Sequence, residues 1–145
     1  MKVILQRATQ ASVSINNRIV SRIHRGFLIL IGFHKEDTEK KNNQLIKKIL
    51  SLRLFSDEKN RQTQSIQDIQ GDILIVSQFT LYADCKKGTR PNYSEAMPSQ
   101  EAKVIYDAFI SEFREQYPQV KTGKFGEMME VSLINEGPFT LILDS

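Results

Sequence analysis

The sequence predicts a single α+β domain, built on a mostly antiparallel sheet or open β-barrel with two main helices. Stretches typical of strands outnumber helical ones, two segments show helical spacing, and strands and helices do not alternate as in βαβ units. The chain has 145 residues, close to the commonest size of one domain, and no repeat or linker divides it. We therefore expect residues 1–145 to form one domain.

The first third of the chain is predicted to consist of strands. Residues 11–15 alternate strictly between apolar and polar side chains, as in a strand with one buried face. Asn16 and Asn17 predict a hairpin turn, because asparagine tolerates left-handed backbone angles. Residues 18–23 then form the returning strand, and residues 27–33 are apolar on both faces, which indicates a buried strand.

Two segments are predicted to be helices. The first begins at about Thr38, with Asp37 as its N-cap. Its apolar stripe consists of Leu45, Ile46, Ile49, Leu50 and Leu52. The second has Pro98 in its first turn and ends before Pro118. Its apolar side chains are Ala102, Ile105, Tyr106, Phe109, Ile110 and Phe113.

The remaining strands are predicted from apolar runs. Residues 72–83 carry the β-rich run DILIVSQFTLYA, which is too apolar for an exposed strand. Two closing strands are expected around residues 130–134 and 139–143. Residues 135–138 (NEGP) separate them and have the composition of a turn.

Charge is unevenly distributed along this basic chain, whose net charge is +3. The first 35 residues contain no acidic residue and six basic ones, which are Lys2, Arg7, Arg18, Arg22, Arg25 and Lys35. A second basic cluster, Lys86, Lys87 and Arg90, lies in a loop rich in Gly and Pro. Such asymmetry indicates either a polyanion partner or a solvated strand face.

Several functional classes are excluded by composition and motifs. No apolar run reaches the roughly 18 to 20 residues of a membrane span, and the N-terminus lacks the apolar region of a signal peptide. The single cysteine, Cys85, cannot form an internal disulfide, and no Cys/His cluster indicates zinc. The chain contains no GxSxG, phosphate-loop, dinucleotide or HExxH motif. We expect a cytoplasmic protein without membrane contact, metal or cofactor.

Two polar interruptions of apolar strands are candidate site segments. Residues 77–80 (SQFT) place two hydroxyl groups and an amide at the end of the DILIV run. Gly137 and Pro138 lie between the two closing strands, where Gly-Pro can mark an unusual backbone geometry. The alternatives are a strand leaving the core and an ordinary turn.

These segments resemble the D-aminoacyl-tRNA deacylase family, also called D-tyrosyl-tRNA deacylase. The resemblance covers the whole chain, and the segments occur in the same order as in the family. The resemblance is carried by VILQRATQASVSI near the N-terminus, SQFTLYAD at 77–84, GTRPNYS at 88–94 and NEGPFT at 135–140. The chain departs from the family in two places. Phe139 stands where valine is usual, and residues 62–65 (QTQS) differ from the common pattern, which leaves the 60–66 loop undefined.

The resemblance implies a hydrolase that cleaves the ester between a D-amino acid and the 3′-terminal ribose of tRNA. The ester is already activated and a neighbouring ribose hydroxyl can assist, so positioning and oxyanion stabilisation suffice without a strong nucleophile. In the family pattern, Ser77 and Gln78 frame the reacting end, and the backbone N–H groups of Phe79 and Thr80 donate to the ester oxygen. We expect Thr80 to position the substrate, because no activating base is visible.

The resemblance also implies a homodimer that proofreads chirality. Gly137 and Pro138 match a Gly-cisPro motif that reaches into the partner subunit's pocket, with its carbonyls directed there, and Arg7 matches the arginine that braces this motif across the dimer. A rigid backbone beside the α-carbon excludes L side chains but admits glycine, so glycine mischarged on alanine tRNA is an expected substrate. Phe125 and Met129 correspond to the family's pocket for the terminal adenosine; their alternative role is core packing.

The expected macromolecular partner is aminoacyl-tRNA. The basic residues of the first 35 positions, together with Lys86, Lys87 and Arg90, are predicted to contact its phosphates. Two other functions are considered: a non-catalytic RNA-binding domain, which needs clustered exposed aromatic residues, and a relaxed relative that hydrolyses L-aminoacyl-tRNA. Most aromatic residues, Tyr93 among them, are predicted to lie in the core, which disfavours the first.

Overall fold

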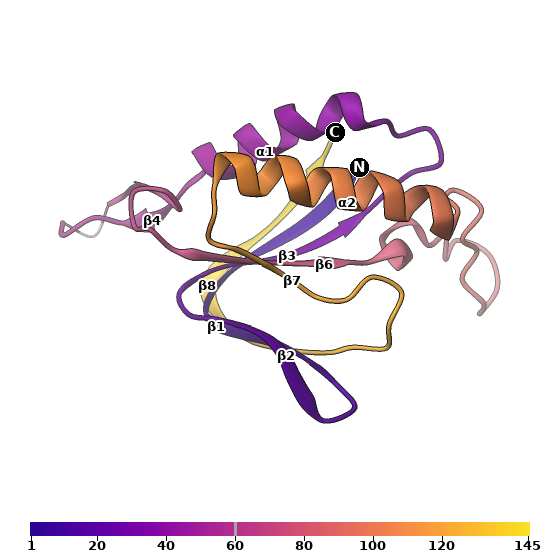
Figure 1. Ribbon diagram of the computed structural model, residues 1–145, viewed down its shortest axis with the longest axis horizontal. Coiled ribbons are helices and arrows are strands. Elements are labelled where there is room, and N and C mark those ends of the chain that lie inside the picture. Colours follow the sequence, from indigo (N-terminus) through magenta and orange to yellow (C-terminus); the bar gives the residue numbers. More distant parts are fainter. Residues whose placement is uncertain (60) are drawn as a thin grey trace.

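A computed structural model describes residues 1–59 and 61–145 of the chain (Figure 1). The strands are β1 (Lys2–Ile15), β2 (Arg18–Ile23), β3 (Gly26–Gly32), β4 (Arg53–Ser56), β5 (Gln62–Ser65), β6 (Asp72–Ser77), β7 (Val120–Thr122) and β8 (Glu130–Asp144). The helices are α1 (Asn42–Ser51) and α2 (Ser99–Gln116), with short 3-10 turns η1 (Glu39–Lys41) and η2 (Phe79–Tyr82). The predicted α+β class with two main helices is confirmed.

The long strand β1 organises the sheet. Its first half pairs with β3, its second half pairs with β2, and β8 pairs antiparallel with it along nearly its full length. Asn16 and Asn17 have positive φ angles of 49° and 61°, as expected for the tight turn that joins β1 to β2. The resulting sheet curls until it is nearly closed into a barrel (Figure 1).

Part of the sheet is parallel, which the sequence analysis missed. β3 pairs parallel with β6, and β6 pairs parallel with β7, so α2 lies in a β–α–β connection. The four residues from Ile73 to Val76 are all buried, because β6 is covered on both faces. Continuous burial of this kind is typical of parallel strands, whose crossovers place helices over the sheet.

The two predicted closing strands form one strand, β8, and the predicted turn at 135–138 is wrong. Gln6 pairs with Thr140 and Ala8 pairs with Asn135, so β1 advances by two residues where β8 advances by five. Three extra residues therefore bulge from β8 at this point. A bulge keeps the strand paired on both sides while turning its middle out of the ladder.

The two helices cover one face of the sheet, and the larger core lies between these layers (Figure 1). The predicted stripe of α1 is buried at Leu45, Ile46, Ile49 and Leu50, whereas Leu52 follows the helix and is half-buried. All six predicted apolar residues of α2 are buried. A smaller cluster, which includes Val13, Leu28 and Leu74, fills the opposite side of the sheet. No helix in residues 1–59 and 61–145 is both long and apolar enough to cross a membrane.

Two local predictions need correction or completion. Asp37 does not cap a helix, because its carboxylate accepts hydrogen bonds from the backbone of His34 and from the amino group of Met1. Helical structure begins after it, with η1, and Thr38 makes no capping hydrogen bond. Of the 60–66 loop, residue 60 lies outside the described residues, and Gln62–Ser65 form β5, which pairs with β4.

Candidate functional site

The first candidate segment, Ser77–Thr80, lies where β6 ends and η2 begins. The backbone N–H of Gln78 donates to the carbonyl of Ile31 at 2.7 Å, which continues the β3–β6 ladder by one bond. A Cβ atom on Gly32 would lie 2.7 Å from the carbonyl oxygen of Gln78. Glycine at position 32 is therefore what lets the segment cross so close to β3.

The polar groups of this segment form a small local network. Gln78 Nε2 donates to Thr80 Oγ1 at 2.5 Å. Among the described residues, no carboxylate or imidazole is hydrogen-bonded to the hydroxyl of Ser77 or Thr80, so neither is paired with a general base. Phe79 and Thr80 are the first two residues of η2. Their backbone N–H groups therefore have no acceptor within the helical turn. These two donors are suited to an oxyanion.

The second candidate segment lies in the bulge of β8. The peptide bond between Gly137 and Pro138 is cis, and both residues are exposed. Arg7 Nε donates to the carbonyl of Glu136 and Nη2 donates to the carbonyl of Gly137, each at 3.2 Å, and Nη1 donates to the carbonyl of Leu54. Arg7 therefore holds this segment within its own chain, whereas the resemblance implied a brace across the dimer. The carbonyl of Gly137 faces this arginine, contrary to the expectation that it points toward a partner.

Arg7 is held between two aromatic rings. Its guanidinium carbon lies 4.4 Å from the ring centroid of Phe139 and 5.8 Å from that of Phe55. Only 7% of the Arg7 surface is exposed. A guanidinium group stacks well on aromatic faces, so the ring of Phe139 shields Arg7 from solvent.

Asn135 and Glu136 complete the bulge, and sequence analysis did not single them out. Asn135 Nδ2 donates to the carbonyls of Arg7 (2.9 Å) and Phe139 (3.1 Å), which ties the base of the bulge to β1. Glu136 accepts from Arg25 through both carboxylate oxygens, at 3.1 and 2.9 Å. The hydrogen bond from Arg25 holds the pKa of Glu136 below its usual value against the effect of burial, and the charges of Arg25 and Arg7 lower it further.

The only sequence signal for this ion pair is that Glu136 directly precedes Gly137. Its partner Arg25 is 111 positions away in the chain, and no local pattern links the two residues. Hydrogen bonding to Glu136 also raises the pKa of Arg25, so the pair stays charged over the physiological range.

The two candidate segments lie beside opposite ends of β3. Arg7, which holds Gly137, pairs with Phe27 at the start of β3, whereas Ser77 is aligned with Ile31 near its end. Four residues of strand separate these positions, or roughly 13 Å along the strand direction. One chain therefore does not bring Gly137 together with Ser77.

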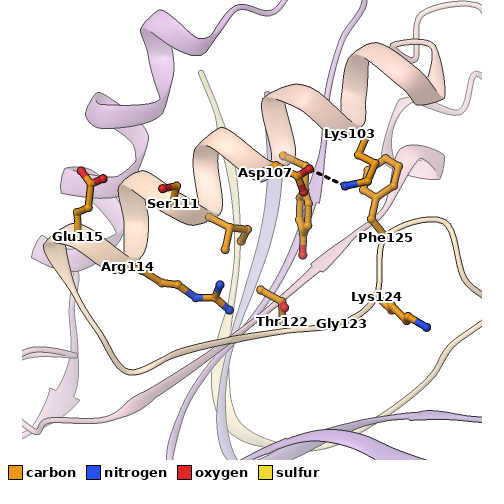
Figure 2. A pocket seen from close by; sticks show the side chains of 11 residues that line it. Lys103, Asp107, Ser111, Arg114, Glu115, Thr122, Gly123, Lys124 and Phe125 are labelled. Atoms are coloured by element: carbon orange, nitrogen blue, oxygen red, sulfur yellow. Dashed lines mark hydrogen bonds and ion pairs between the residues drawn. The ribbon is translucent and has the colours of Figure 1, made fainter.

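A hollow of about 810 Å³ lies between α2 and the residues that follow β7 (Figure 2). It is lined by Lys103, Tyr106, Asp107, Ile110, Ser111, Arg114, Glu115, Thr122, Gly123, Lys124 and Phe125. The Phe125 ring lies 5.4 Å from that of Tyr106, whose buried hydroxyl donates to the carbonyl of Ile75 on β6. Burial raises the pKa of this phenol, so it stays protonated.

Phe125 and Met129, both expected in the adenosine pocket, lie on different sides of the same loop. Phe125 lines the hollow and packs against the core under the helices. Met129 packs against the smaller cluster, and its sulfur accepts a hydrogen bond from the backbone of Lys124. The structure does not bring the two side chains together in that hollow.

The basic residues of the first 35 positions do not form one free surface. Arg7 is buried, Arg25 binds Glu136, and Lys35 binds Glu95 at 2.9 Å. Lys2 Nζ donates to the carbonyl of Leu81. By contrast, Lys86, Lys87 and Arg90 are all exposed, as is Cys85. In the described part of the chain, no three His, Cys, Asp or Glu side chains are placed to hold a metal ion.

The chain resembles known proteins along its whole length. Residues 4–144 match the family model described as D-Tyr-tRNA(Tyr) deacylase. D-aminoacyl-tRNA deacylases of Thermosipho melanesiensis and Bacillus cereus (strain AH187) are 47% and 48% identical to it. The alignments cover all of this chain and 97% and 99% of those proteins.

Two solved structures share the fold. The c-Myc DNA unwinding element binding protein superposes with a TM-score of 0.94 and 41% identity, covering 100% of this chain and 99% of the other. A probable eukaryotic D-amino acid tRNA deacylase superposes with a TM-score of 0.88 at 22% identity, covering 99% and 98%. The chain therefore belongs to the D-Tyr-tRNA(Tyr) deacylase family of hydrolases.

Proposed function

We propose that this protein hydrolyses the ester that joins a D-amino acid to the 3′-terminal ribose of tRNA, and that it does so in the cytoplasm. The observation that carries the proposal is the Ser77–Thr80 segment, which offers two backbone donors but no nucleophile paired with a base. Hydrolysis of an aminoacyl ester needs few other protein groups, because the ester is activated and carries a neighbouring ribose hydroxyl.

The chemical step adds water to the ester carbonyl. The carbonyl oxygen becomes negatively charged and accepts hydrogen bonds from the N–H groups of Phe79 and Thr80. The bond to the ribose oxygen then breaks, and a proton from the attacking water passes to that oxygen with help from the neighbouring hydroxyl. Free amino acid and tRNA are released. Thr80 positions the substrate, since its hydroxyl accepts from Gln78 and faces no base.

Selectivity is assigned to Gly137 and Pro138. Both are exposed, and a Cβ on Gly137 would meet no atom within 4 Å, so this backbone projects into open space. Arg7 donates to the carbonyls of Glu136 and Gly137, and Asn135 donates to the carbonyls of Arg7 and Phe139, so these bonds hold the segment in place. A rigid backbone placed beside the α-carbon of the substrate excludes an L side chain by contact but leaves room for hydrogen. D-amino acids pass, and glycine on alanine tRNA passes as well.

The separation of the two segments within one chain supports a homodimer. Since Gly137 and Ser77 lie beside opposite ends of β3, Gly137 and Pro138 act on the Ser77–Thr80 segment of a second copy. A two-fold dimer gives each site one segment from each chain. The hollow beside Phe125 is assigned to the terminal adenosine.

The test compares hydrolysis rates of D-tyrosyl-, L-tyrosyl- and glycyl-tRNA at equal concentration. We expect fast hydrolysis of the D-ester and the glycyl ester and a far slower reaction of the L-ester. Binding of all three without hydrolysis would instead support a non-catalytic RNA-binding domain, and efficient hydrolysis of the L-ester would support a relaxed deacylase.

A further inference from the structure

Two aromatic rings pack together on the surface beside the Ser77–Thr80 segment. The ring centroids of Phe79 and Tyr93 lie 5.1 Å apart in an edge-to-face arrangement. The two residues are 57% and 39% exposed, which contradicts the expectation that Tyr93 lies in the core. The proposed chemistry uses only the backbone of Phe79 and gives Tyr93 no role. Within one chain the pair therefore presents aromatic surface outside the core.

The loop that carries Tyr93 is held in place at its base. The backbones of Asp84 and Asn92 exchange two hydrogen bonds, of 2.7 and 2.9 Å. Asn92 Oδ1 also accepts from the backbone N–H of Ser94, and Asp84 Oδ1 accepts from that of Lys86. These bonds fix Tyr93 at the foot of the loop, next to Phe79.

The tip of the same loop is strongly basic. Lys86, Lys87 and Arg90 are exposed, and none of them forms an ion pair with a carboxylate of residues 1–59 or 61–145. Three unpaired cations and two exposed rings thus occupy adjoining surface at the end of β6. Proteins that bind single-stranded nucleic acids combine these features, because bases stack on aromatic rings and cations hold the phosphates.

We propose that Phe79 and Tyr93 form a stacking platform for the unpaired nucleotides that precede the terminal adenosine of tRNA. Lys86, Lys87 and Arg90 then hold the phosphates of the same strand. This inference rests on the proposed function, which places the terminal ribose at the backbone of Phe79. Stacking suits a proofreading hydrolase because every base has an aromatic face, so the platform accepts many tRNAs.

A fluorescence experiment tests the platform without measuring catalysis. The chain contains no tryptophan, so Tyr93→Trp introduces a single reporter at the platform. We expect its emission to be quenched by a single-stranded RNA with the 3′ sequence of tRNA, and much less by a blunt RNA duplex of equal length. Ile19→Trp, at a 53% exposed position on β2, is the matched control and should not respond. Equal quenching by duplex and single strand, or none with either RNA, would overturn the proposal.

Kinetics separate stacking from a general structural effect. Tyr93→Leu should raise KM for D-tyrosyl-tRNA by about 5- to 150-fold, the range expected for losing one stacked base, with kcat unchanged. Tyr93→Phe keeps the ring and should stay near the unaltered value. Hydrolysis of D-tyrosyl-adenosine, which lacks the preceding nucleotides, should be unaffected by either substitution. An equal loss on this short substrate would refute the platform.

The proposed function can fail independently of the platform. If the unaltered protein cleaves neither D-tyrosyl-tRNA nor D-tyrosyl-adenosine, the proposed deacylation is wrong. Selective quenching of the Tyr93→Trp protein by single-stranded RNA would still support the platform in that case.

Discussion

The amino group of Met1 lies 2.7 Å from Asp37 Oδ2, and their side chains are only 0% and 4% exposed. The same amino group donates to the carbonyl of Ser145 at 3.2 Å, and Lys41 Nζ bridges Asp37 and Ser145. The start of the chain, its end and the segment before α1 are therefore joined by one ionic cluster, of which the Met1–Asp37 pair is buried. The two ends of the chain lie close together in Figure 1. Removing one member of such a cluster leaves an uncompensated buried charge.

The first prediction concerns stability at low pH. Burial opposes ionisation of Asp37, but hydrogen bonds from the Met1 amino group and the His34 backbone, with the charges of Met1 and Lys41, hold its pKa below the usual value. A pKa lowered on folding stabilises the protein above the unfolded pKa of about 3.9, and this contribution is lost as pH falls through the folded value. Urea unfolding measured from pH 7 to pH 2 should show a free energy of unfolding that begins to decline near pH 4.

Asp37→Asn is the control for this dependence. It should lower the free energy of unfolding at pH 7 by about 3–5 kcal/mol, because the Met1 amino group stays buried without its anion. Its stability should also vary less between pH 4 and pH 2. If the variant and the parent show the same acid slope, other carboxylates account for it.

The second prediction contrasts the two ion contacts that hold the β8 bulge. Arg7→Lys should cost about 1–3 kcal/mol of stability and reduce the D-over-L rate ratio, because one ammonium cannot replace donors to three separate carbonyls. Glu136→Gln should cost less than about 1 kcal/mol, since Arg25 is half exposed and solvent screens the pair. Thermal unfolding and rates on both enantiomers check this order. A larger effect of Glu136→Gln on the rate ratio would mean that Arg25 is the main support.

Local patterns in the sequence are enough to predict the fold class and most of the helices and strands. Alternation, asparagine turns and helical spacing act over a few residues, which is why β2, α1, α2 and the first hairpin were predicted correctly. The parallel pairing of β6 and the continuity of β8 depend on partners far along the chain. A bulge and a turn have the same composition at 135–138, and only pairing with β1 distinguishes them.

The motifs of the candidate site could be predicted from the sequence, but the residues that hold these motifs in place could not. The segments at 77–80 and 137–138 stood out as polar breaks in apolar runs. The roles of Arg25, Asn135 and the Met1–Asp37 pair could not be predicted, because each acts through a contact more than 30 positions away. Tyr93 was misjudged for a related reason, since aromatic content alone does not distinguish a core ring from one paired on the surface.

The third prediction distinguishes oxyanion stabilisation from a nucleophilic threonine. Phe79→Pro removes one backbone donor at the first position of η2, where proline is tolerated, and the preceding Gln78 is not helical (φ −148°, ψ 86°). It should slow D-ester hydrolysis by about 100- to 1000-fold. Thr80→Ala should retain substantial activity, and Phe79→Ala controls for loss of the ring. An acyl group trapped on Thr80, identified by mass spectrometry, would contradict this assignment.

The fourth prediction concerns the basic loop. Replacing Lys86, Lys87 and Arg90 together by alanine should weaken tRNA binding with little change in stability, since all three are exposed. Each lost phosphate contact should flatten the plot of log affinity against log salt by about 0.7–0.9. Lys47→Ala with Lys48→Ala, two exposed cations on α1, is the matched control and should change the slope less. An unchanged slope in the triple variant would remove the loop from the RNA surface.

The last prediction tests whether each site draws on two chains. Pro138→Gly removes the rigid ring proposed to exclude L side chains, so a homodimer of this variant should hydrolyse both tyrosyl enantiomers. A Phe79→Pro homodimer should be slow on both. In a heterodimer of the two, purified through different C-terminal tags, the Ser77–Thr80 segment of the Pro138→Gly chain meets an intact Gly137–Pro138 pair from its partner. Hydrolysis of L-tyrosyl-tRNA should then fall while hydrolysis of D-tyrosyl-tRNA persists. If both segments act within one chain, the Pro138→Gly chain should hydrolyse L-tyrosyl-tRNA whatever its partner. Light scattering distinguishes this outcome from failure of the chains to associate, which would give a mass near 16.7 kDa.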